Sequence, residues 1–479
     1  MRPRAIEAVA GAGTGFARSA DAVRSRAVSI AAIGFSLVVV FLGAAQRLPA
    51  VPLIAALIGG FLALGALRRP SRALALGFAA VIVIPIYYLP VLPGTQVGLT
   101  PVAVASLVLL PLALTRVRHL RLGALDFAFL ALVVLRVVSF LLNYRSGWGA
   151  TASALLTIAL PYTAFRLVST YPNAHRVFAR AVVVAGLPLA CIGIAERRGW
   201  PNPFFNSLAT GYQSTKWARP LLRFHTVRAE ASFGHPIMFG MFLAVALALA
   251  IALAWTAARP RNRVAYLVAV AVMAAALVDT LSRGPLLMFA LFLPLWGITQ
   301  VARLDPRRVR AGLAMLVVIV AVAAPARDTL HALRTQSTGS SIEAKSARFR
   351  VQLVEIAADP ANFTWLGQRS EEEGGFTDVV FSRIGVRAVD NTFVLLYLTG
   401  GALVMLAFFV LMLLTFLAAL RPGLDPVERA LAIILSIAFV NLLTVNLSTN
   451  FADVFWISLA GLASALQRHR LRIPALANR

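Results

Sequence analysis

The chain contains a single cysteine, Cys191, which lies inside a long apolar run. A disulfide framework is therefore excluded, and so is a metal site built from several thiolates. No group of histidine, cysteine and acidic residues has the spacing of metal ligands, and the sequence has no glycine-rich phosphate loop of the Walker type. We therefore predict neither a metal nor another cofactor, and the sequence does not support direct use of ATP.

Charged residues are also scarce, at 13% of the 479 residues, whereas 59% are hydrophobic. The mean hydropathy of +0.81 is far above that of a soluble domain. Several apolar runs reach the roughly 17–25 residues that are needed to cross about 30 Å of hydrocarbon. The sequence thus predicts an all-α, polytopic integral membrane protein with about 12–14 transmembrane helices.

The predicted spans divide the chain into bundles and loops. In chain order the candidate spans are 28–45, 51–67, 73–91, 101–115, 124–142, 149–165, 181–195, 235–258, 264–280, 284–302, 311–326, 392–420, 430–446 and 453–467. The resulting segments are a basic N-terminus (1–27), an N-terminal bundle (28–195), a loop (196–234), a central bundle (235–326), a large loop (327–391), a C-terminal bundle (392–467) and a tail (468–479). The large loop is predicted to contain short helices.

Acidic residues are few, 19 against 45 lysines and arginines, and the net charge is +26. Because the cations fall between spans, we expect membrane lipids and phosphates as partners rather than nucleic acid. Clusters of arginine occur in every second short loop, that is, on one side of the membrane. The positive-inside rule assigns that side, and with it both termini, to the cytoplasm. On the outside, the short loops carry only Arg47, Arg145 and Arg283.

The remaining outside cations lie in the loops 196–234 and 327–391, which flank Arg283 in the sequence. They include Arg348, Arg350 and Arg387. One interpretation is an ordinary solvated loop surface. The other is a positively charged vestibule outside the membrane, which would suit a diphosphate. We favour the second because these cations are confined to two loops on either side of Arg283.

Three local patterns contain the candidate site residues. The segment Arg228–Pro236 contains Glu230 and leads into a helix through a Gly-His-Pro turn. The short turn 279–285 contains Arg283, which either binds substrate or extends toward lipid headgroups. The pair Asp390-Asn391 precedes a helix starting near Thr392.

Alternatives remain open at several of these residues. Asp390 either acts on substrate or caps the helix that follows it. Glu230 either forms an ion pair with Arg228 or serves as a base. Arg136, inside a predicted span, either extends outward to the surface or lines a substrate groove.

In order and spacing, these patterns resemble the O-antigen ligase and O-antigen polymerase-like superfamily of bacterial membrane proteins. The matching segments are Arg228–Pro236, Ser282-Arg283-Gly284, Arg348-Phe349-Arg350 leading to Leu366-Gly367, and Asp390-Asn391 with Gly401 after nine residues. The similarity covers roughly Arg197 to Leu420. Two positions differ from the pattern: Asp390 stands where many ligases of this superfamily carry a histidine, and Val404 stands where the motif usually continues with Gly, Thr or Tyr.

The resemblance implies a metal-independent glycosyltransferase at the outer face of the bacterial cytoplasmic membrane. The donor would be a glycan on undecaprenyl diphosphate, and the acceptor a sugar hydroxyl of another glycan. Arg228 and Arg283 would hold the diphosphate, and Asp390 would activate the acceptor hydroxyl. Arg348, Arg350, Arg387, Glu230 and Asn391 are further expected substrate contacts.

Two other classes of protein remain as alternatives. A transporter or flippase of lipid-linked glycan would be expected to show repeated halves and charges buried within its spans. The sequence has no internal repeat, and we place only Arg136 deep in a span. A non-catalytic membrane protein of polysaccharide assembly is the third alternative.

Overall fold

The computed structural model describes residues 70–85, 100–143, 147–171, 173–206, 220–223, 226–301, 342–367, 389–447 and 449–477. These residues form a helical bundle and one very small sheet. The bundle helices are α3 (Pro70–Val83), α4 (Pro101–Leu114), α5 (Ala124–Asn143), α6 (Gly147–Ala154), α7 (Leu160–Val168), α8 (Ala174–Arg197), α11 (Pro236–Thr256), α12 (Pro260–Asp279), α13 (Arg283–Val301), α18 (Thr392–Ala419), α19 (Pro426–Asn441) and α20 (Thr449–Ala477). A π-helical turn, η2 (Leu155–Ala159), joins α6 to α7.

The smaller elements lie in the segments between the bundle helices. They are η1 (Val117–His119), α9 (Pro203–Asn206), β1 (Leu222–Arg223), β2 (Thr226–Val227), η3 (Ala231–Phe233), α16 (Ile342–Ala358) and η5 (Pro360–Asn362). The strands β1 and β2 are antiparallel, with Leu222 opposite Val227 and Arg223 opposite Thr226.

Six of the described helical segments are long and apolar enough to cross a membrane. They are Ala124–Asn143, Trp148–Val168, Ala174–Arg197, Pro236–Thr256, Pro260–Asp279 and Thr392–Ala419. The predicted class, a polytopic all-α membrane protein, is thereby confirmed. The predicted spans 28–45, 51–67 and 311–326 lie outside the described residues.

Helix α11 is the centre of the bundle, and 94% of its most apolar 18-residue stretch is buried. It packs against α8, α12, α13 and α19. A helix that is apolar on every side is stable only when other helices surround it or lipid covers it. As predicted, the Gly-His-Pro turn leads into a helix. Helix α11 begins at Pro236, and His235 caps it by accepting a hydrogen bond at Nδ1 from the N–H of Ile237 (3.2 Å).

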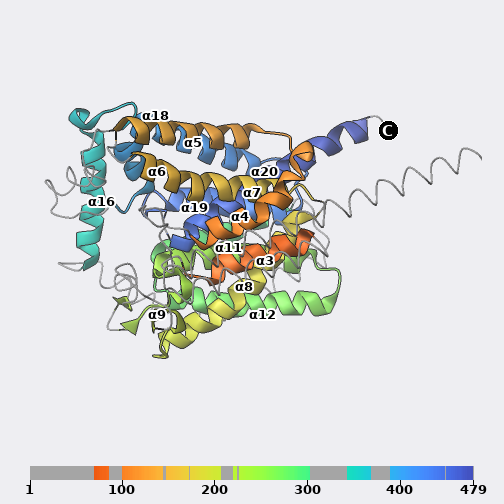
Figure 1. Ribbon diagram of the computed structural model, residues 1–479. Helices are drawn as coiled ribbons and strands as arrows, with labels where there is room; N and C mark the ends of the chain where they lie inside the picture. Colours follow the sequence, from red (N-terminus) through yellow and green to blue (C-terminus); the bar gives the residue numbers. More distant parts are fainter. Residues whose placement is uncertain are drawn as a thin grey trace, which may run out of the picture.

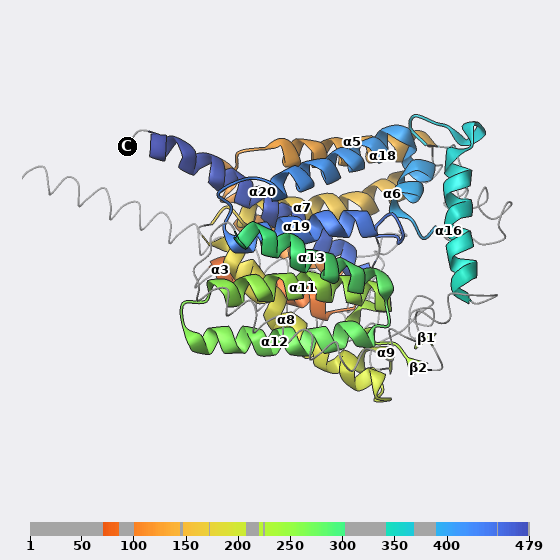
Figure 2. The same ribbon diagram turned by 180° about the vertical axis from the view of Figure 1, so that it is seen from behind.

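The bundle has two distinct ends. At one end α5, α8, α12 and α19 finish, while α4, α11, α13, α18 and α20 begin. Helix α16 lies across this end in both ribbon views, and β1 and β2 lie there too (Figures 1 and 2). We call it the α16 end. The C-terminal part of α20 projects from the opposite end, which we call the C-terminal end (Figure 1).

A buried ion pair joins α5 to α7 at the C-terminal end. Arg166 is 2% exposed and Asp126 is 5% exposed. The guanidinium donates from Nε to Oδ1 of Asp126 (2.8 Å) and from Nη2 to Oδ2 (3.1 Å), and Tyr162 donates its hydroxyl to the same carboxylate (2.9 Å). Because Arg166 also donates to Ser464 of α20 (3.0 Å), the pair ties three helices together.

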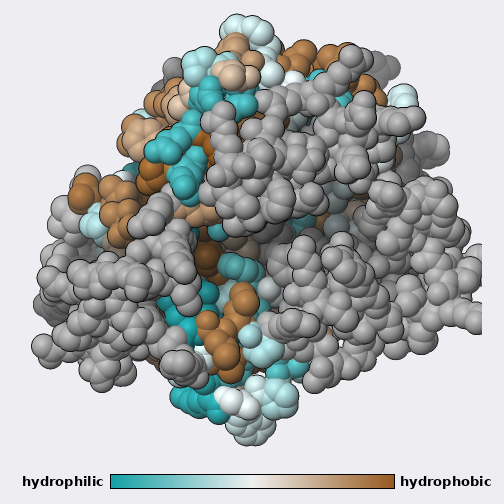
Figure 3. Space-filling model, turned by 90° about the vertical axis from the view of Figure 1, so that its left-hand side faces the viewer, coloured by the Kyte–Doolittle hydropathy of each residue, from teal (hydrophilic) through white to brown (hydrophobic). Residues whose placement is uncertain are grey.

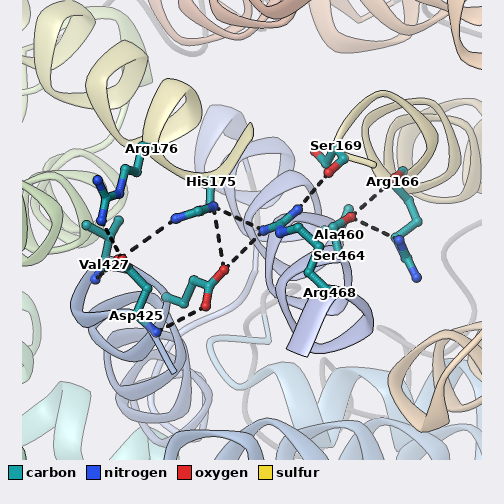
Figure 4. A network of polar contacts seen from close by, with 10 residues as sticks. Arg166, Ser169, His175, Arg176, Asp425, Val427, Ala460, Ser464 and Arg468 are labelled. Carbon is teal, nitrogen blue, oxygen red and sulfur yellow. Dashed lines mark hydrogen bonds and ion pairs between the residues drawn. The ribbon is translucent and has the colours of Figure 1, made fainter. Parts of the chain in front are cut away.

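A second polar group links α8, α19 and α20 at the same end (Figure 4). Arg468 donates to Glu428 of α19 (3.2 Å) and contacts His175 of α8 (3.2 Å). Arg176 donates to Asp425 at 2.6 Å, with 40% of the arginine side chain exposed. Both groups fix helix positions far from the candidate site residues predicted from the sequence.

Candidate functional site

Arg228 lies against the turn between α12 and α13. Its Nε donates to the carbonyl oxygen of Thr280 (2.9 Å), and its Nη2 donates to Oγ of Ser282 (2.7 Å), 54 residues further along the chain. The N–H of Ala229 donates to the carbonyl oxygen of Asp279 (3.1 Å). The structure therefore brings together two of the three predicted sequence patterns.

Two more arginines lie on the same turn. Arg223, held by the short sheet, donates from Nη1 to the carbonyl oxygen of Leu281 (2.6 Å). Arg283 is exposed at the first residue of α13. Burial, together with the charge of Arg223, lowers the pKa of Arg228 to about 10, so Arg228 remains a cation at neutral pH. We call Arg223, Arg228 and Arg283 the arginine cluster, and such a cluster suits a phosphate-bearing ligand.

The expected ion pair between Glu230 and Arg228 does not form. The Arg228 guanidinium is directed at the turn, while Oε1 of Glu230 accepts a hydrogen bond from the N–H of Leu221 (2.9 Å). The other oxygen, Oε2, has no hydrogen-bond partner among the described residues. Glu230 is 0% exposed, so its carboxyl lies behind the arginine cluster rather than on its surface.

Burial raises the pKa of Glu230 to about 8, and the negative charge of Glu196 adds to this effect. Glu196, in turn, accepts hydrogen bonds from the N–H groups of Glu230 (2.9 Å) and Ala231 (3.0 Å) and from Asn202 (2.9 Å). At neutral pH Glu230 is therefore mainly protonated. Two buried acids support the loop that carries Arg228.

We expect Glu230→Gln to be tolerated and to flatten the pH dependence of stability. The pKa of about 8 in the folded protein exceeds the ordinary glutamate value of 4.5. The stabilising contribution of Glu230 to the free energy of unfolding is therefore fully present below pH 4.5, and it is lost as the pH rises through 8. Thermal midpoints of the purified protein between pH 5 and 9 provide the measurement. A wild-type slope retained in Glu230→Gln would assign the pH dependence to another group.

Gly284 places the α12–α13 turn against the end of α19. A Cβ atom at Gly284 would lie 2.6 Å from Oδ1 of Asn441, the last residue of that helix. The Nδ2 atom of Asn441 is buried and has no hydrogen-bond partner among the described residues. Asn441 therefore offers an unused donor directly beside the turn that carries Arg283.

The start of α18 packs against the segment that follows α19. The N–H of Thr392 donates to the carbonyl oxygens of Leu442 (3.0 Å) and Val445 (3.2 Å), and its hydroxyl donates to Val445 as well (2.9 Å). Asp390, two residues before Thr392, is exposed. The third predicted pattern is thus connected to the other two through residues 441–445. Figure 3 views this end, where hydrophilic and hydrophobic surfaces of described residues adjoin.

The structure shows that Asn391, not Asp390, caps α18. Oδ1 of Asn391 accepts hydrogen bonds from the N–H groups of Phe393 (2.9 Å) and Val394 (3.1 Å). The alternative in which Asp390 serves as the helix cap is therefore wrong. Asn391 itself is buried, which makes it a structural neighbour of the site.

Gly401 interrupts α18 with φ 82° and ψ 179°. A Cβ atom there would collide with the backbone of the segment 365–367, and the N–H groups of Ala402 and Leu403 donate to Thr364 (2.9 Å) and Trp365 (3.1 Å). Only glycine combines this φ with such close backbone approach. The kink therefore anchors the segment that follows α16, and it brings Leu366-Gly367 against Gly401.

The remaining predicted contacts lie on or beyond α16. Arg350 is half-buried on this helix, and its Nε has no hydrogen-bond partner within the described part of the chain. The backbone of Arg348 is part of the same helix. Arg387 lies outside the described residues. Helix α16 packs against α18.

A cavity of about 240 Å³ lies beneath the start of α18. Thr392, Arg136 and Asp453 are in its wall, together with the ring of Trp456. For Arg136 this location matches the groove-lining alternative. Asp453 belongs to α20, so a second charged residue lies within the predicted spans.

Sequence reasoning did not single out Arg223, Asn441 or Asp453. Arg223 is one of many loop cations, and only its position in the short sheet distinguishes it. Asn441 resembles any polar residue at a helix end. Asp453, however, is an acidic residue at the start of an apolar run, and such residues deserve a functional hypothesis from sequence alone.

Comparisons with known proteins give no match. No family model, no curated protein and no solved structure is detectably similar to this chain.

Proposed function

We propose that the protein is a membrane glycosyltransferase that moves a glycan from undecaprenyl diphosphate to a sugar hydroxyl, as in O-antigen ligases and polymerases. The observation that carries this proposal is the convergence of three sequence patterns at the α16 end. Arg228 bonds to Ser282, Gly284 lies against Asn441, and Leu442 accepts the N–H of Thr392. The resemblance supports the same reaction.

The arginine cluster would bind the diphosphate of the donor. A guanidinium can donate two parallel hydrogen bonds to phosphate oxygens, and it stabilises the charge that develops on the leaving diphosphate. Arg228 is positioned by Thr280 and Ser282, so little conformational entropy remains to be lost on binding.

Asp390 would act on the acceptor. Its side chain is exposed at the start of α18 and has no role in capping, so it is available to accept the proton of a sugar hydroxyl. The fully buried Glu230 is less suited to this role, because a substrate hydroxyl cannot reach its carboxyl without rearrangement of the loop.

This proposal requires the α16 end to face outward. We expect cysteine at Trp200, an exposed residue of this end, to react with an impermeant thiol reagent in intact cells. Cysteine at Asn262, exposed at the opposite end, should react only after permeabilisation. Both variants are made in a Cys191→Ser background. Labelling of the Asn262 position from outside would reverse the orientation and exclude the proposed donor site.

The proposed donor site is tested by Arg283→Lys, which keeps the positive charge but loses the forked geometry. Loss of a charge-assisted hydrogen bond of about 1.5–3 kcal/mol should slow transfer roughly ten- to a hundredfold. The measurement is the length or attachment of glycan in cells, with membrane abundance of each variant determined alongside. Arg198→Lys, an exposed arginine of the same end, is the matched control. Normal transfer by Arg283→Lys and Arg228→Ala would remove the cluster from the site.

The cavity observation favours a second candidate, a transporter of lipid-linked glycan. Arg136 and Asp453 both lie within predicted spans and line one cavity, as residues of a translocation path do. Vesicles containing the purified protein distinguish the two functions. A transporter moves a fluorescent lipid-linked glycan between leaflets and leaves it unchanged, whereas a transferase changes the glycan.

A further inference from the structure

The cavity beneath the start of α18 has a mostly apolar wall that includes a few polar side chains. Much of the lining is apolar, from α5, α18 and α20, and includes Leu132, Leu396, Phe408 and Trp456. The polar groups in it are few and lie on different elements: Arg136 on α5, Thr157 on the π-helical turn, Asp453 on α20, and Thr100, Thr392 and Asn446 near the α16 end. A mostly apolar pocket with a few converging polar groups is the usual form of a small-molecule site.

Asp453 is the residue that the fold does not explain. It is 3% exposed, and burial is the only influence on its carboxyl, with no hydrogen bond or ion pair to any residue that the structure describes. Arg136, in the same wall, lies over the ring of Phe140 at 4.8 Å instead of pairing with Asp453. By contrast Asn450, one turn earlier on α20, is also buried and donates to the carbonyl oxygens of Val81 (3.2 Å) and Ile84 (2.7 Å).

A buried carboxyl group without hydrogen-bond donors is costly, and an apolar residue of similar size would make the bundle more stable. Such a group fits a site whose donors come from a ligand. An isoprenoid tail has no donors, so it would leave the carboxyl unsatisfied. A sugar ring supplies several hydroxyl donors, while its C–H face packs against an aromatic ring such as that of Trp456.

The volume of the cavity limits the size of the ligand that it can hold. Pockets for drug-sized ligands measure roughly 300–1,000 Å³, whereas this one measures about 240 Å³. It therefore suits one ring rather than an oligosaccharide. Thr392, at its wall, is two residues from Asp390, so a ring bound there lies on the acceptor side of the site.

We propose that this cavity binds one sugar ring of the acceptor glycan, with Asp453 accepting hydrogen bonds from its hydroxyls and Trp456 packing against the ring. The inference rests on the proposed transferase function and names its acceptor subsite. It assigns Asp453 to acceptor binding, separate from the arginine cluster that binds the donor.

The test uses Asp453→Leu in the full-length protein, with Asn450→Leu as the matched control from the same helix. Asp453→Leu should raise the thermal midpoint of the purified protein by a few degrees, yet reduce glycan transfer in cells at least tenfold. Asn450→Leu should lower the midpoint, because it removes two buried hydrogen bonds. A lower midpoint or lost membrane abundance in Asp453→Leu would make Asp453 a structural residue and overturn the proposal.

Ligand binding gives a second measurement that does not depend on transfer. Methyl glycosides of common hexoses, at millimolar concentration, should raise the thermal midpoint of the wild type but not that of Asp453→Leu. Stabilisation by geraniol and by none of the glycosides would identify a hydrocarbon pocket instead.

The two proposals fail in different ways. Normal transfer by Asp453→Leu, with transfer still impaired in Arg283→Lys, would overturn the acceptor subsite alone. Normal transfer by Asp453→Leu, Arg283→Lys, Arg228→Ala and Asp390→Asn would overturn the transferase. In that case, glycoside stabilisation that is lost in Asp453→Leu would still support a sugar site in the cavity.

Discussion

Asp390→Asn is expected to reduce glycan transfer by about 100- to 10,000-fold, the usual contribution of a general base. An amide keeps the size and polarity of the side chain but cannot take a proton from the acceptor hydroxyl. The fold should be unaffected, because the residue is exposed and Asn391 supplies the cap of α18. Glycan length or attachment in cells, normalised to membrane abundance, is the measurement.

The control for this variant is Glu355→Gln, which removes an exposed carboxylate of α16 at the same end. It should leave transfer unchanged, and so exclude a general effect of lost negative charge. Asp390→His adds a sharper comparison, since an imidazole can accept the proton and should restore part of the activity that Asn loses. Full transfer by Asp390→Asn at normal abundance would show that the base lies elsewhere.

The membrane-spanning helices could be predicted because each depends on its own residues. An apolar run of sufficient length satisfies its backbone hydrogen bonds internally, whatever its neighbours are. The start of α11 at Pro236 follows from local chemistry as well. The cap of α18 shows where local chemistry is insufficient. Asp and Asn cap equally well, so the sequence Asp390-Asn391 cannot indicate which of the two turns inward.

Pairings between distant residues were much harder to predict. The neighbouring position of Arg228 and Glu230 suggested an ion pair, but the turn 280–282 offers Arg228 two acceptors, and Leu221 offers Glu230 a donor. Such choices depend on which segments the folded bundle brings together. Asp453 is a different case, because an acidic residue at the start of an apolar run is visible in the sequence. Only the surrounding helices show that it has no hydrogen-bond partner among the described residues.

Asp126→Ala is expected to cost about 3–5 kcal/mol of stability, the usual effect of removing one partner from a buried ion pair. The carboxylate accepts hydrogen bonds from Arg166, Tyr162 and the N–H of Gly123. Without it, the Arg166 guanidinium stays buried, and its remaining partners among the described residues are neutral. We expect a much lower thermal midpoint of the purified protein and little protein in the membrane.

Two comparisons show whether the loss comes from the buried charge. Arg176→Ala removes an ion pair to Asp425 that is partly exposed, so its cost should stay within about 1 kcal/mol. The double variant Asp126→Leu with Arg166→Met replaces both charges by apolar groups and should recover much of the stability that Asp126→Ala loses. The contrary result is a double variant as unstable as Asp126→Ala. That result would show that α5, α7 and α20 are held together mainly by the hydrogen bonds of Arg166 to Ser464 and Gln467 and of Tyr162 to Asp126. The uncompensated charge would then be the lesser effect.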